Sequence, residues 1–328
     1  MVKDFIKPLV TMIVVIIVLA SGAFINNKID DKYNNTYDLN LNTELVVQDD
    51  DALHMFVNNA VVKKDEQIND NLTAGCYYSL FIDEDDKNVL VAKNAHKRMY
   101  PASLTKLMTA LIVCEKIEDG SIGLDDIVTL EKSYDLSSEG VGPCEIGYGC
   151  KISVKDLMYG LLLQSNNYYA IILGEYVAGD ITSFCDLMNR KAAVIGATNS
   201  HFVNPHGLDH PDHYTTAYDI YLIIKEAYSH ELIRQIDSVN TYTYSYLNQA
   251  DNEVVVDISA TSFFALGIVP LPAGYTIECW KTGTTDAAGN ALALYLTKDD
   301  KKYIAIASNP ESKTELYSAI VKMLNLAQ

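Results

Sequence analysis

Arginine is scarce in this 328-residue sequence, which contains only Arg98, Arg190 and Arg234. Basic residues as a whole are outnumbered, since 25 Lys and Arg stand against 43 Asp and Glu, for a net charge of −18. A protein that binds the phosphate backbone needs a basic face, and arginine is the residue best suited to hold phosphate with two hydrogen bonds. Nucleic acid is therefore not an expected partner.

The sequence also lacks a CxxC pair and any visible internal repeat, which leaves a zinc ribbon without support. Its six cysteines would be oxidisable outside the cytoplasm. Cys144 and Cys150 lie close together in a glycine-rich stretch and could close a local disulfide loop. Cys114 lies in an apolar helical run and is expected to be a plain core residue. The sequence does not determine which cysteines pair.

The overall composition is that of a folded protein. Hydrophobic residues make up 49% and charged residues 21% of the chain, which is too apolar for a disordered protein. At roughly 150 residues per domain, the length corresponds to about two units or one large one.

The first 27 residues indicate the compartment. Residues 8–27 carry no charge and would form a helix of ~30 Å, about the thickness of a bilayer core. Lys3 and Lys7 precede this run, as expected for an N-terminus that stays inside. The run is either an uncleaved membrane anchor, which is slightly favoured, or a signal peptide cleaved near residues 21–23. Both interpretations place everything after about residue 28 outside the cytoplasm, anchored to the cell membrane or secreted.

Residues 28–72 form an acidic, polar segment with ten acids against four lysines. This composition predicts a solvated stalk or linker, with one short ordered piece near residues 45–62. We expect the folded domain to occupy residues 73–328.

The first half of that domain is expected to begin with a hairpin, in which residues 76–83 and 88–92 flank a charged turn. Residues 103–230 are then mostly helical. One helix follows Pro101 and ends at Gly120, and two more cover residues 154–163, with Ser153 as N-cap, and 168–178.

The C-terminal part returns to strands, at residues 275–285, 291–297 and 302–308. A last helix starts at Ser312, which forms a capping-box pattern with Glu315. Strands at both ends with helices between them predict one antiparallel sheet covered by helices, in which the two ends of the domain meet.

Three short motifs carry residues suited to chemistry. In the first, Ser103 and Lys106 lie three residues apart at a predicted helix start, so both side chains point to one face. A serine needs a base to take its proton, and a lysine can serve if its pKa is lowered. On its own the pair is also explained by a capping serine and a solvated lysine.

The second motif, with Ser165 and Asn167, lies between two predicted helices and can relay a proton and hold a substrate amide. The third, Lys281-Thr282-Gly283, lies on an apolar strand. There the glycine permits close approach, while the lysine and threonine can hold a carboxylate. Each alone has an ordinary structural explanation, a polar loop or an edge-strand lysine.

The order and placement of the three motifs together resemble the penicillin-recognising serine acyltransferases, with S-x-x-K, S-x-N and K-T-G. The chain is most similar to the D-alanyl-D-alanine carboxypeptidases, the low-molecular-weight penicillin-binding proteins. The stretches that carry this resemblance are residues 100–110, 156–162, 202–208, 214–219 and 281–289. It implies a β-lactamase/transpeptidase-like α/β (α+β) fold, with an antiparallel five-stranded sheet flanked by helices and a mostly helical subdomain.

The resemblance implies a role for each catalytic residue. Ser103 would be the acylated nucleophile, Lys106 its general base, and Ser165 and Asn167 would assist proton transfer and positioning. The substrate would be a peptidoglycan stem peptide ending in D-Ala–D-Ala, cleaved through an acyl-enzyme. β-Lactams would acylate Ser103 as covalent inhibitors. No metal or cofactor is expected.

The same resemblance places Lys281 and Thr282 against the terminal carboxylate of the substrate, with Gly283 and Thr284 completing the binding strand. The backbone N–H groups of Ser103 and Thr284 would form the oxyanion hole.

The sequence departs from the family at Tyr168, where an acidic residue usually follows S-x-N. Many relatives also have a second, β-rich domain and a C-terminal amphipathic anchor, whereas only 47 residues follow Lys281. Membrane attachment is therefore expected at the N-terminus. Two alternatives remain open, a class A-like β-lactamase, which needs a glutamate-activated water, and a catalytically silent cell-wall-binding protein.

Four histidines and two aspartates, all within residues 201–213, invite a zinc hypothesis. Their spacing fits no strong metal pattern, so we expect a structural loop near the active site.

Overall fold

The computed structural model of the chain describes residues 59–62, 70–73 and 75–327. The apolar N-terminal run and most of the acidic segment lie outside these residues. Within the described part of the chain, no helix is both long and apolar enough to cross a membrane.

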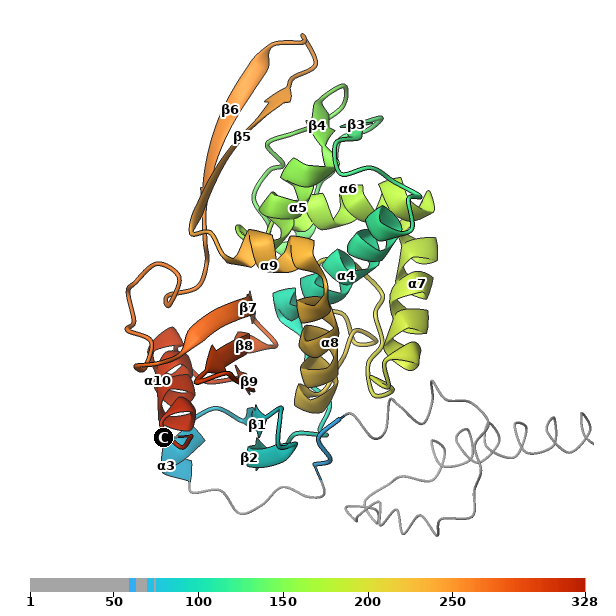
Figure 1. Cartoon of the computed structure of the whole chain (residues 1–328). Coiled ribbons are helices and arrows are strands. Elements are labelled where there is room, and N and C mark those ends of the chain that lie inside the picture. The colour runs from blue at the N-terminus through green and yellow to red at the C-terminus, as the bar shows by residue number, and fades with distance from the viewer. Residues whose placement is uncertain (1–58, 63–69, 74, 328) are drawn as a thin grey trace, which may run out of the picture. The chain divides into compact units, whose positions relative to one another are not determined.

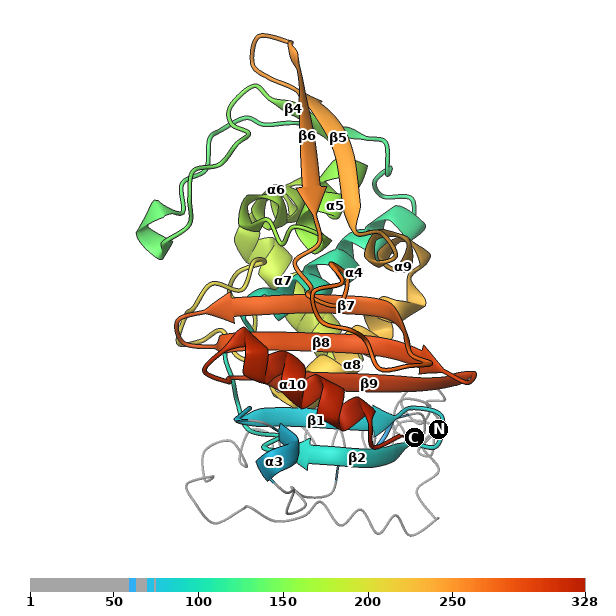
Figure 2. The same ribbon diagram turned by 90° about the vertical axis from the view of Figure 1, so that its left-hand side faces the viewer.

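A five-stranded antiparallel sheet forms the centre of the described unit and confirms the predicted architecture (Figure 2). Its strands, in the order β2-β1-β9-β8-β7, are β2 (Asn88–Lys93), β1 (Tyr78–Asp83), β9 (Lys301–Ser308), β8 (Gly289–Lys298) and β7 (Thr276–Thr285). Because β1 pairs with β9, the N-terminal hairpin and the C-terminal strands meet in one sheet, as expected. β7 is an edge strand of this sheet, so its unpaired edge faces the helical part of the unit.

Helices cover both faces of this sheet. α10 (Lys313–Leu324) and the short α3 (Asp70–Thr73) lie on one face, and α8 (Ala217–Ser229) packs on the other (Figures 1 and 2). The predicted capping box of α10 is present, since Ser312 and Glu315 exchange side chain to backbone hydrogen bonds. Because helices cover both faces, the side chains on both sides of β8 are buried over its central residues. Its sequence there is therefore continuously apolar instead of alternating between apolar and polar residues.

The remaining helices form the second half of the unit. They are α4 (Thr105–Glu118), α5 (Val154–Leu162), α6 (Asn167–Ala178), α7 (Ile181–Val194) and α9 (Glu231–Asp237), together with the 3₁₀ turns η1 (Ala102–Leu104) and η2 (Ser137–Glu139). Ser153 caps α5 as predicted, by accepting the N–H of Asp156. α4 is buried on every side over its first ten residues, so it runs through the middle of this half.

A second, four-stranded sheet was not predicted from the sequence. Its order is β3 (Ile127–Thr129), β4 (Lys151–Ser153), β5 (Thr241–Leu247) and β6 (Glu253–Ser259). β3 and β4 have three residues each, too few for a periodic signal. The β5–β6 hairpin projects from the helical half (Figure 1). Its sequence carried a usable signal, the alternating tyrosines of β5 followed by an Asn- and Asp-rich turn.

The local disulfide that Cys144 and Cys150 could have closed is not formed, since all six cysteines are free thiols in the described residues. Cys150 is buried, and its Sγ instead accepts the backbone N–H of Gly147 at 3.5 Å. Cys114 is buried in α4, as expected for a core residue.

Part of the predicted stalk packs on the folded unit. The backbone N–H of Ala60 donates to the Tyr221 hydroxyl at 3.0 Å, and the Tyr218 hydroxyl donates to the Ala60 carbonyl at 2.9 Å. Ala60 is fully buried, so residues 59–62 belong structurally with α8.

Candidate active site

The turn that presents Ser103 has an unusual backbone. Ala102, directly before it, has a φ of +47°, a value that side chain-bearing residues seldom adopt. Gly207 lies against this turn, and a Cβ there would fall 1.8 Å from the Ala102 carbonyl oxygen. Only glycine therefore fits at position 207, and its close approach holds the nucleophile turn in place.

Lys106 lies one helical turn beyond Ser103, and its side chain is completely buried. Its Nζ is 2.9 Å from Ser103 Oγ, 2.6 Å from Asn167 Oδ1 and 2.7 Å from the His206 carbonyl oxygen. Burial, and next the positive charge of Lys281, lower the pKa of Lys106 well below its usual value of 10.5.

These three contacts define what a neutral Lys106 can do. A neutral amine has two N–H bonds and one lone pair. The Asn167 amide oxygen and the His206 carbonyl oxygen can only accept, so they receive the two N–H bonds. The lone pair is then left facing the Ser103 hydroxyl, which is the arrangement that a general base requires.

The second motif lies in the α5–α6 loop, as predicted. Asn166 caps α6 by accepting the N–H groups of Tyr168 and Tyr169, which fixes Asn167 as the first helical residue. Ser165 has a φ of +64° and lines the cavity described below, but its hydroxyl makes no hydrogen bond to Lys106.

Tyr168, the departure from the family pattern, is buried and points away from the site. Its hydroxyl donates to the Gly142 carbonyl at 2.7 Å and accepts the N–H of Leu136 at 3.3 Å. It therefore anchors the loop around η2.

The third motif lies on β7, where the edge strand runs beside η1. Gly283 is the point of contact, since a Cβ there would lie 3.0 Å from Ala102 Cβ and 3.1 Å from the Ser103 backbone nitrogen. The sequence suggested that this glycine lets a ligand backbone approach. In the structure it also makes room for the nucleophile turn itself.

Lys281 lies on the same strand with its side chain fully buried, and its Nζ donates to the Thr282 carbonyl at 3.2 Å. It is not among the residues of the cavity wall described below. Burial lowers the pKa of Lys281 to about 7, and the nearby Asp237 carboxylate opposes this shift. Thr282 faces the other way, with its Oγ1 2.6 Å from Thr261 Oγ1.

A cavity of about 190 Å³ joins these elements. Its wall includes Ser103, Ser165, Thr261, Thr282, Gly283, Thr284, Asn290, Ala291, Lys313, Leu316 and Tyr317. Three motifs separated by 62 and 116 residues in the sequence thus converge on one cavity. Lys313, an exposed cation on α10, is a wall residue that the sequence did not point to.

A relay of hydrogen bonds supports the nucleophile turn from behind. His213 is buried, and its Nδ1 accepts the N–H of Val203 at 3.1 Å. Its Nε2 therefore carries the hydrogen and donates to Thr105 Oγ1 at 2.9 Å, which donates to the Ala102 carbonyl at 2.8 Å. Burial lowers the pKa of His213 to about 3, so the ring stays neutral near pH 7. The sequence predicted only that this histidine belongs to a structural loop near the active site.

The other histidines of the suspected zinc loop also make local contacts. His206 Nδ1 accepts the Leu208 N–H at 3.2 Å, and His210 Nδ1 accepts the Asp212 N–H at 3.1 Å. His201 Nδ1 lies 2.6 Å from the Asp212 carbonyl oxygen. These rings stabilise the loop that supplies the His206 carbonyl to Lys106.

The contact at Gly283 leads to a first prediction. Gly283→Ala should lower the rate at which Ser103 is acylated, because the added methyl group pushes β7 away from η1. The loss of stability should be about 1–3 kcal/mol, typical of overpacking. Gly142→Ala is the control, since a Cβ there meets nothing within 4 Å. Equal acylation rates for the two variants would show that the close approach of β7 is not needed.

Comparison with known proteins gives a consistent picture. A family profile described as D-alanyl-D-alanine carboxypeptidase matches residues 62–311. The D-alanyl-D-alanine carboxypeptidase DacF of Bacillus subtilis is 29% identical over 274 residues, covering 83% of this chain and 67% of the relative. The D-alanyl-D-alanine carboxypeptidase DacC of Escherichia coli is 30% identical over 251 residues, which cover 75% of this chain and 59% of the relative. The matched part of this chain thus spans about three fifths to two thirds of the length of these relatives.

Solved structures agree on the fold. A DD-transpeptidase from Streptomyces superposes with a TM-score of 0.69 at 23% identity, covering 77% of this chain and 98% of the other. The D-alanyl-D-alanine carboxypeptidase DacD from Francisella tularensis superposes with a TM-score of 0.65 at 23% identity. The match covers 82% of this chain and 73% of the other.

Proposed function

Since this chain belongs to the D-alanyl-D-alanine carboxypeptidase family, we propose that it is a serine-type carboxypeptidase that removes the terminal D-alanine from peptidoglycan stem peptides. The observation that carries the proposal is the buried Lys106 amine, which contacts both Ser103 Oγ and Asn167 Oδ1. A lysine with a lowered pKa beside a serine hydroxyl is equipped for nucleophilic catalysis.

In the first half of the reaction, Ser103 Oγ attacks the carbonyl carbon of the penultimate D-alanine, and its proton passes to Lys106. The backbone N–H groups of Ser103 and Thr284 are the proposed donors to the oxyanion. The proximity of Gly283 to the Ser103 backbone supports this pairing. Collapse of the intermediate breaks the amide bond, and the leaving amine takes the proton from Lys106, while Ser165 lies on the same cavity wall and can assist this transfer once substrate is bound.

In the second half, water attacks the ester carbonyl and gives a proton to Lys106, which returns it to Ser103 Oγ as the acid leaves. Asn167 and the His206 carbonyl hold the amine in place throughout. A β-lactam enters the same path, but its leaving group stays attached through the opened ring, so the acyl-enzyme persists.

The substrate carboxylate needs cationic and hydrogen-bonding partners on the cavity wall. Thr282 and Thr284 lie on that wall, and Lys281 is a buried residue of the same strand. Because Lys281 is buried and outside the cavity wall, it would attract the carboxylate by its charge rather than by a direct contact. Lys313 is the cation on the wall itself.

Lys313 therefore gives a second prediction. Lys313→Gln should lower kcat/KM for a peptide with a free terminal carboxylate by about 10- to 100-fold, the scale of one charged hydrogen bond. For an analogue with an amidated terminus, the same substitution should change kcat/KM only slightly, because that substrate has no carboxylate for Lys313 to bind. Lys97→Gln, on an exposed lysine, is the control. Equal loss on both substrates would contradict the assigned contact.

The β-lactamase alternative lacks a supporting feature in the described structure. A class A enzyme uses a glutamate to activate the deacylating water. No acidic side chain belongs to the cavity wall as described. Rapid, repeated hydrolysis of penicillin by the purified protein would favour this alternative, and a long-lived adduct favours the carboxypeptidase.

We place the site outside the cytoplasm, where peptidoglycan lies. The uncharged run of residues 8–27 supports export, with the protein anchored in the membrane or released after cleavage. Western blots of membrane and medium fractions from cells that express the full chain would distinguish the two forms.

The direct test of the proposed activity is release of D-alanine from an N-acylated peptide ending in D-Ala–D-Ala. We expect one D-alanine for each peptide cleaved, and inhibition by penicillin. A protein that labels with penicillin but releases no D-alanine would be a silent cell-wall-binding member instead.

A further inference from the structure

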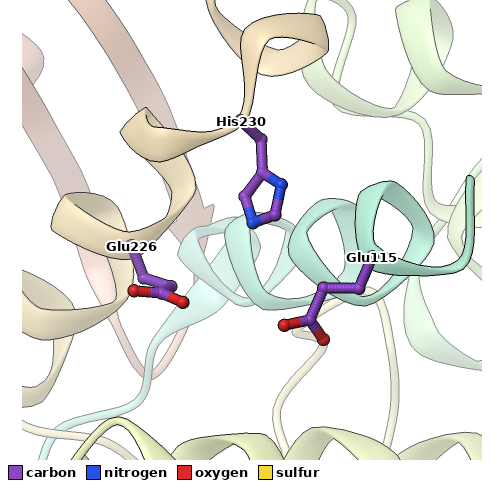
Figure 3. A group of neighbouring side chains, drawn as sticks. All are labelled: Glu115, Glu226 and His230. Carbon is purple, nitrogen blue, oxygen red and sulfur yellow. The ribbon is translucent and has the colours of Figure 1, made fainter. Parts of the chain in front are cut away.

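A second group of reactive side chains lies at the far end of α4 from Ser103. Glu115 on α4, Glu226 on α8 and His230 just beyond α8 each offer one ligand atom, and these atoms lie within 4.8 Å of one another (Figure 3). Glu115 is nine residues beyond Lys106, or ~13 Å along the helix. The group is therefore separate from the proposed active site, and the proposed reaction does not use it.

His230 is the most informative member. Its side chain is only 8% exposed, and its Nδ1 lies 2.8 Å from Glu118 Oε1. An ionised carboxylate can only accept, so Nδ1 carries the hydrogen. In the neutral ring Nε2 is then a lone pair, and this atom is buried without any hydrogen-bond partner. Figure 3 shows the ring pointing into the space between the two glutamates.

This arrangement has the form of a metal-ligating histidine. In metal sites the second ring nitrogen commonly donates to a carboxylate, which fixes the tautomer and aims the first nitrogen at the ion. Glu118 supplies that carboxylate here. A buried lone pair needs a hydrogen-bond donor or a cation, and the two ionised carboxylates beside it can supply neither.

The electrostatics of the helices also favour a cation at this place. Glu115 and Glu118 lie in the last turn of α4, and Glu226 lies in the last turn of α8. The C-terminal end of a helix carries partial negative charge, so acids there are unfavourable unless they are neutralised. Two such ends, each with its acids, meet at this point.

Lys191 of α7 is the cation that holds the two glutamates in this structure. Its Nζ lies 2.6 Å from Glu115 Oε1 and 2.7 Å from Glu226 Oε1. It supplies one positive charge for two carboxylates and leaves His230 Nε2 without a partner. A divalent ion would match the charge of the pair and would bind the imidazole as well.

We propose that Glu115, Glu226 and His230 bind one divalent transition-metal ion of the Zn²⁺ type, with Lys191 displaced toward solvent. Two carboxylate oxygens and one imidazole nitrogen suit Zn²⁺, with water completing the coordination, whereas Ca²⁺ prefers six to eight oxygens. The two glutamate side chains are 37% and 38% exposed, so an ion can reach the site from solvent.

The ion would join α4, α8 and the start of α9 behind the helix that carries Lys106. Its expected effect is on stability, since a ligand that binds only the folded state raises the unfolding temperature. The proposal is independent of the carboxypeptidase assignment, and Ser103→Ala protein should bind the ion equally well.

The experiment titrates the chelator-treated full chain with Zn²⁺ by calorimetry and with Co²⁺ by visible absorption. We expect one ion per chain, d–d bands of a four- or five-coordinate site, and a rise in the unfolding temperature with Zn²⁺ but not with Ca²⁺. His230→Gln should weaken binding at least about tenfold. Lys191→Gln should bind more tightly than the unchanged chain, because the competing ammonium is removed.

Controls distinguish this site from adventitious binding. His210→Gln removes an exposed histidine and should leave the affinity unchanged. If His230→Gln does not fold, Glu226→Gln serves instead, since that side chain is partly exposed and its loss should also weaken binding at least about tenfold. No binding, or binding that is lost in His210→Gln and kept in the His230 and Glu226 variants, would overturn the proposal.

Discussion

Ser103→Ala should abolish the release of D-alanine from a peptide ending in D-Ala–D-Ala. We expect a fall in kcat on the order of 10⁶-fold, the scale seen when a serine nucleophile is removed. The reason is that no second hydroxyl stands 2.9 Å from the Lys106 amine among the contacts described for it. The measurement is a coupled assay for free D-alanine.

The fold should survive this change. Ser103 is half-buried in a 3₁₀ turn, and its replacement removes one oxygen atom without opening the core. The unfolding temperature and the circular dichroism spectrum should therefore match those of the unchanged protein. Undiminished D-alanine release by a folded Ser103→Ala protein would mean that another residue is the nucleophile.

Lys106→Met should slow acylation by a β-lactam by about 10²- to 10⁴-fold, the contribution of a general base. Methionine is similar in length and apolar, so it fills the buried space but cannot take the serine proton. The measurement is the second-order rate constant for acylation, followed by stopped flow or by quenched samples.

The pH dependence separates a base from a merely structural lysine. Acylation by the unchanged protein should rise with pH as Lys106 loses its proton, and the low pKa of Lys106 places this rise below the range of an ordinary lysine. Lys281, with a pKa of about 7, opposes part of this rise, because the loss of its positive charge removes one of the two influences that lower the pKa of Lys106. In the Lys106→Met variant, the part of the pH dependence that comes from Lys106 should disappear. An acylation rate equal to that of the unchanged protein would contradict the role of Lys106 as general base.

The sequence predicted the elements that carry strong local signals. The hairpin at the N-terminal end of the domain, the N-cap of α5, the capping box of α10 and the three apolar C-terminal strands all lie where expected. The pairing of β1 with β9 also followed from strands at both ends of the domain. The candidate residues followed from motif order, because S-x-x-K, S-x-N and K-T-G each fell on a suitable element.

What the sequence could not supply depends on distant contacts. The Lys106 bond to the His206 carbonyl and the relay from His213 to the Ala102 carbonyl join residues about one hundred positions apart. Backbone carbonyls leave no trace in side chain patterns. Lys313 was also missed, since its place on the cavity wall depends on how α10 crosses the sheet. The cluster around His230 has no local motif at all.

The most direct test of the account is the intact mass of the protein after exposure to penicillin. Because the β-lactam ring opens without losing a fragment, the mass should rise by that of the whole antibiotic. Trypsin cleaves after Arg98 and Lys106, so the adduct should lie on peptide 99–106, whose single serine is Ser103. An unmodified chain, or an adduct on any other peptide, would contradict the claim that Ser103 is the activated nucleophile.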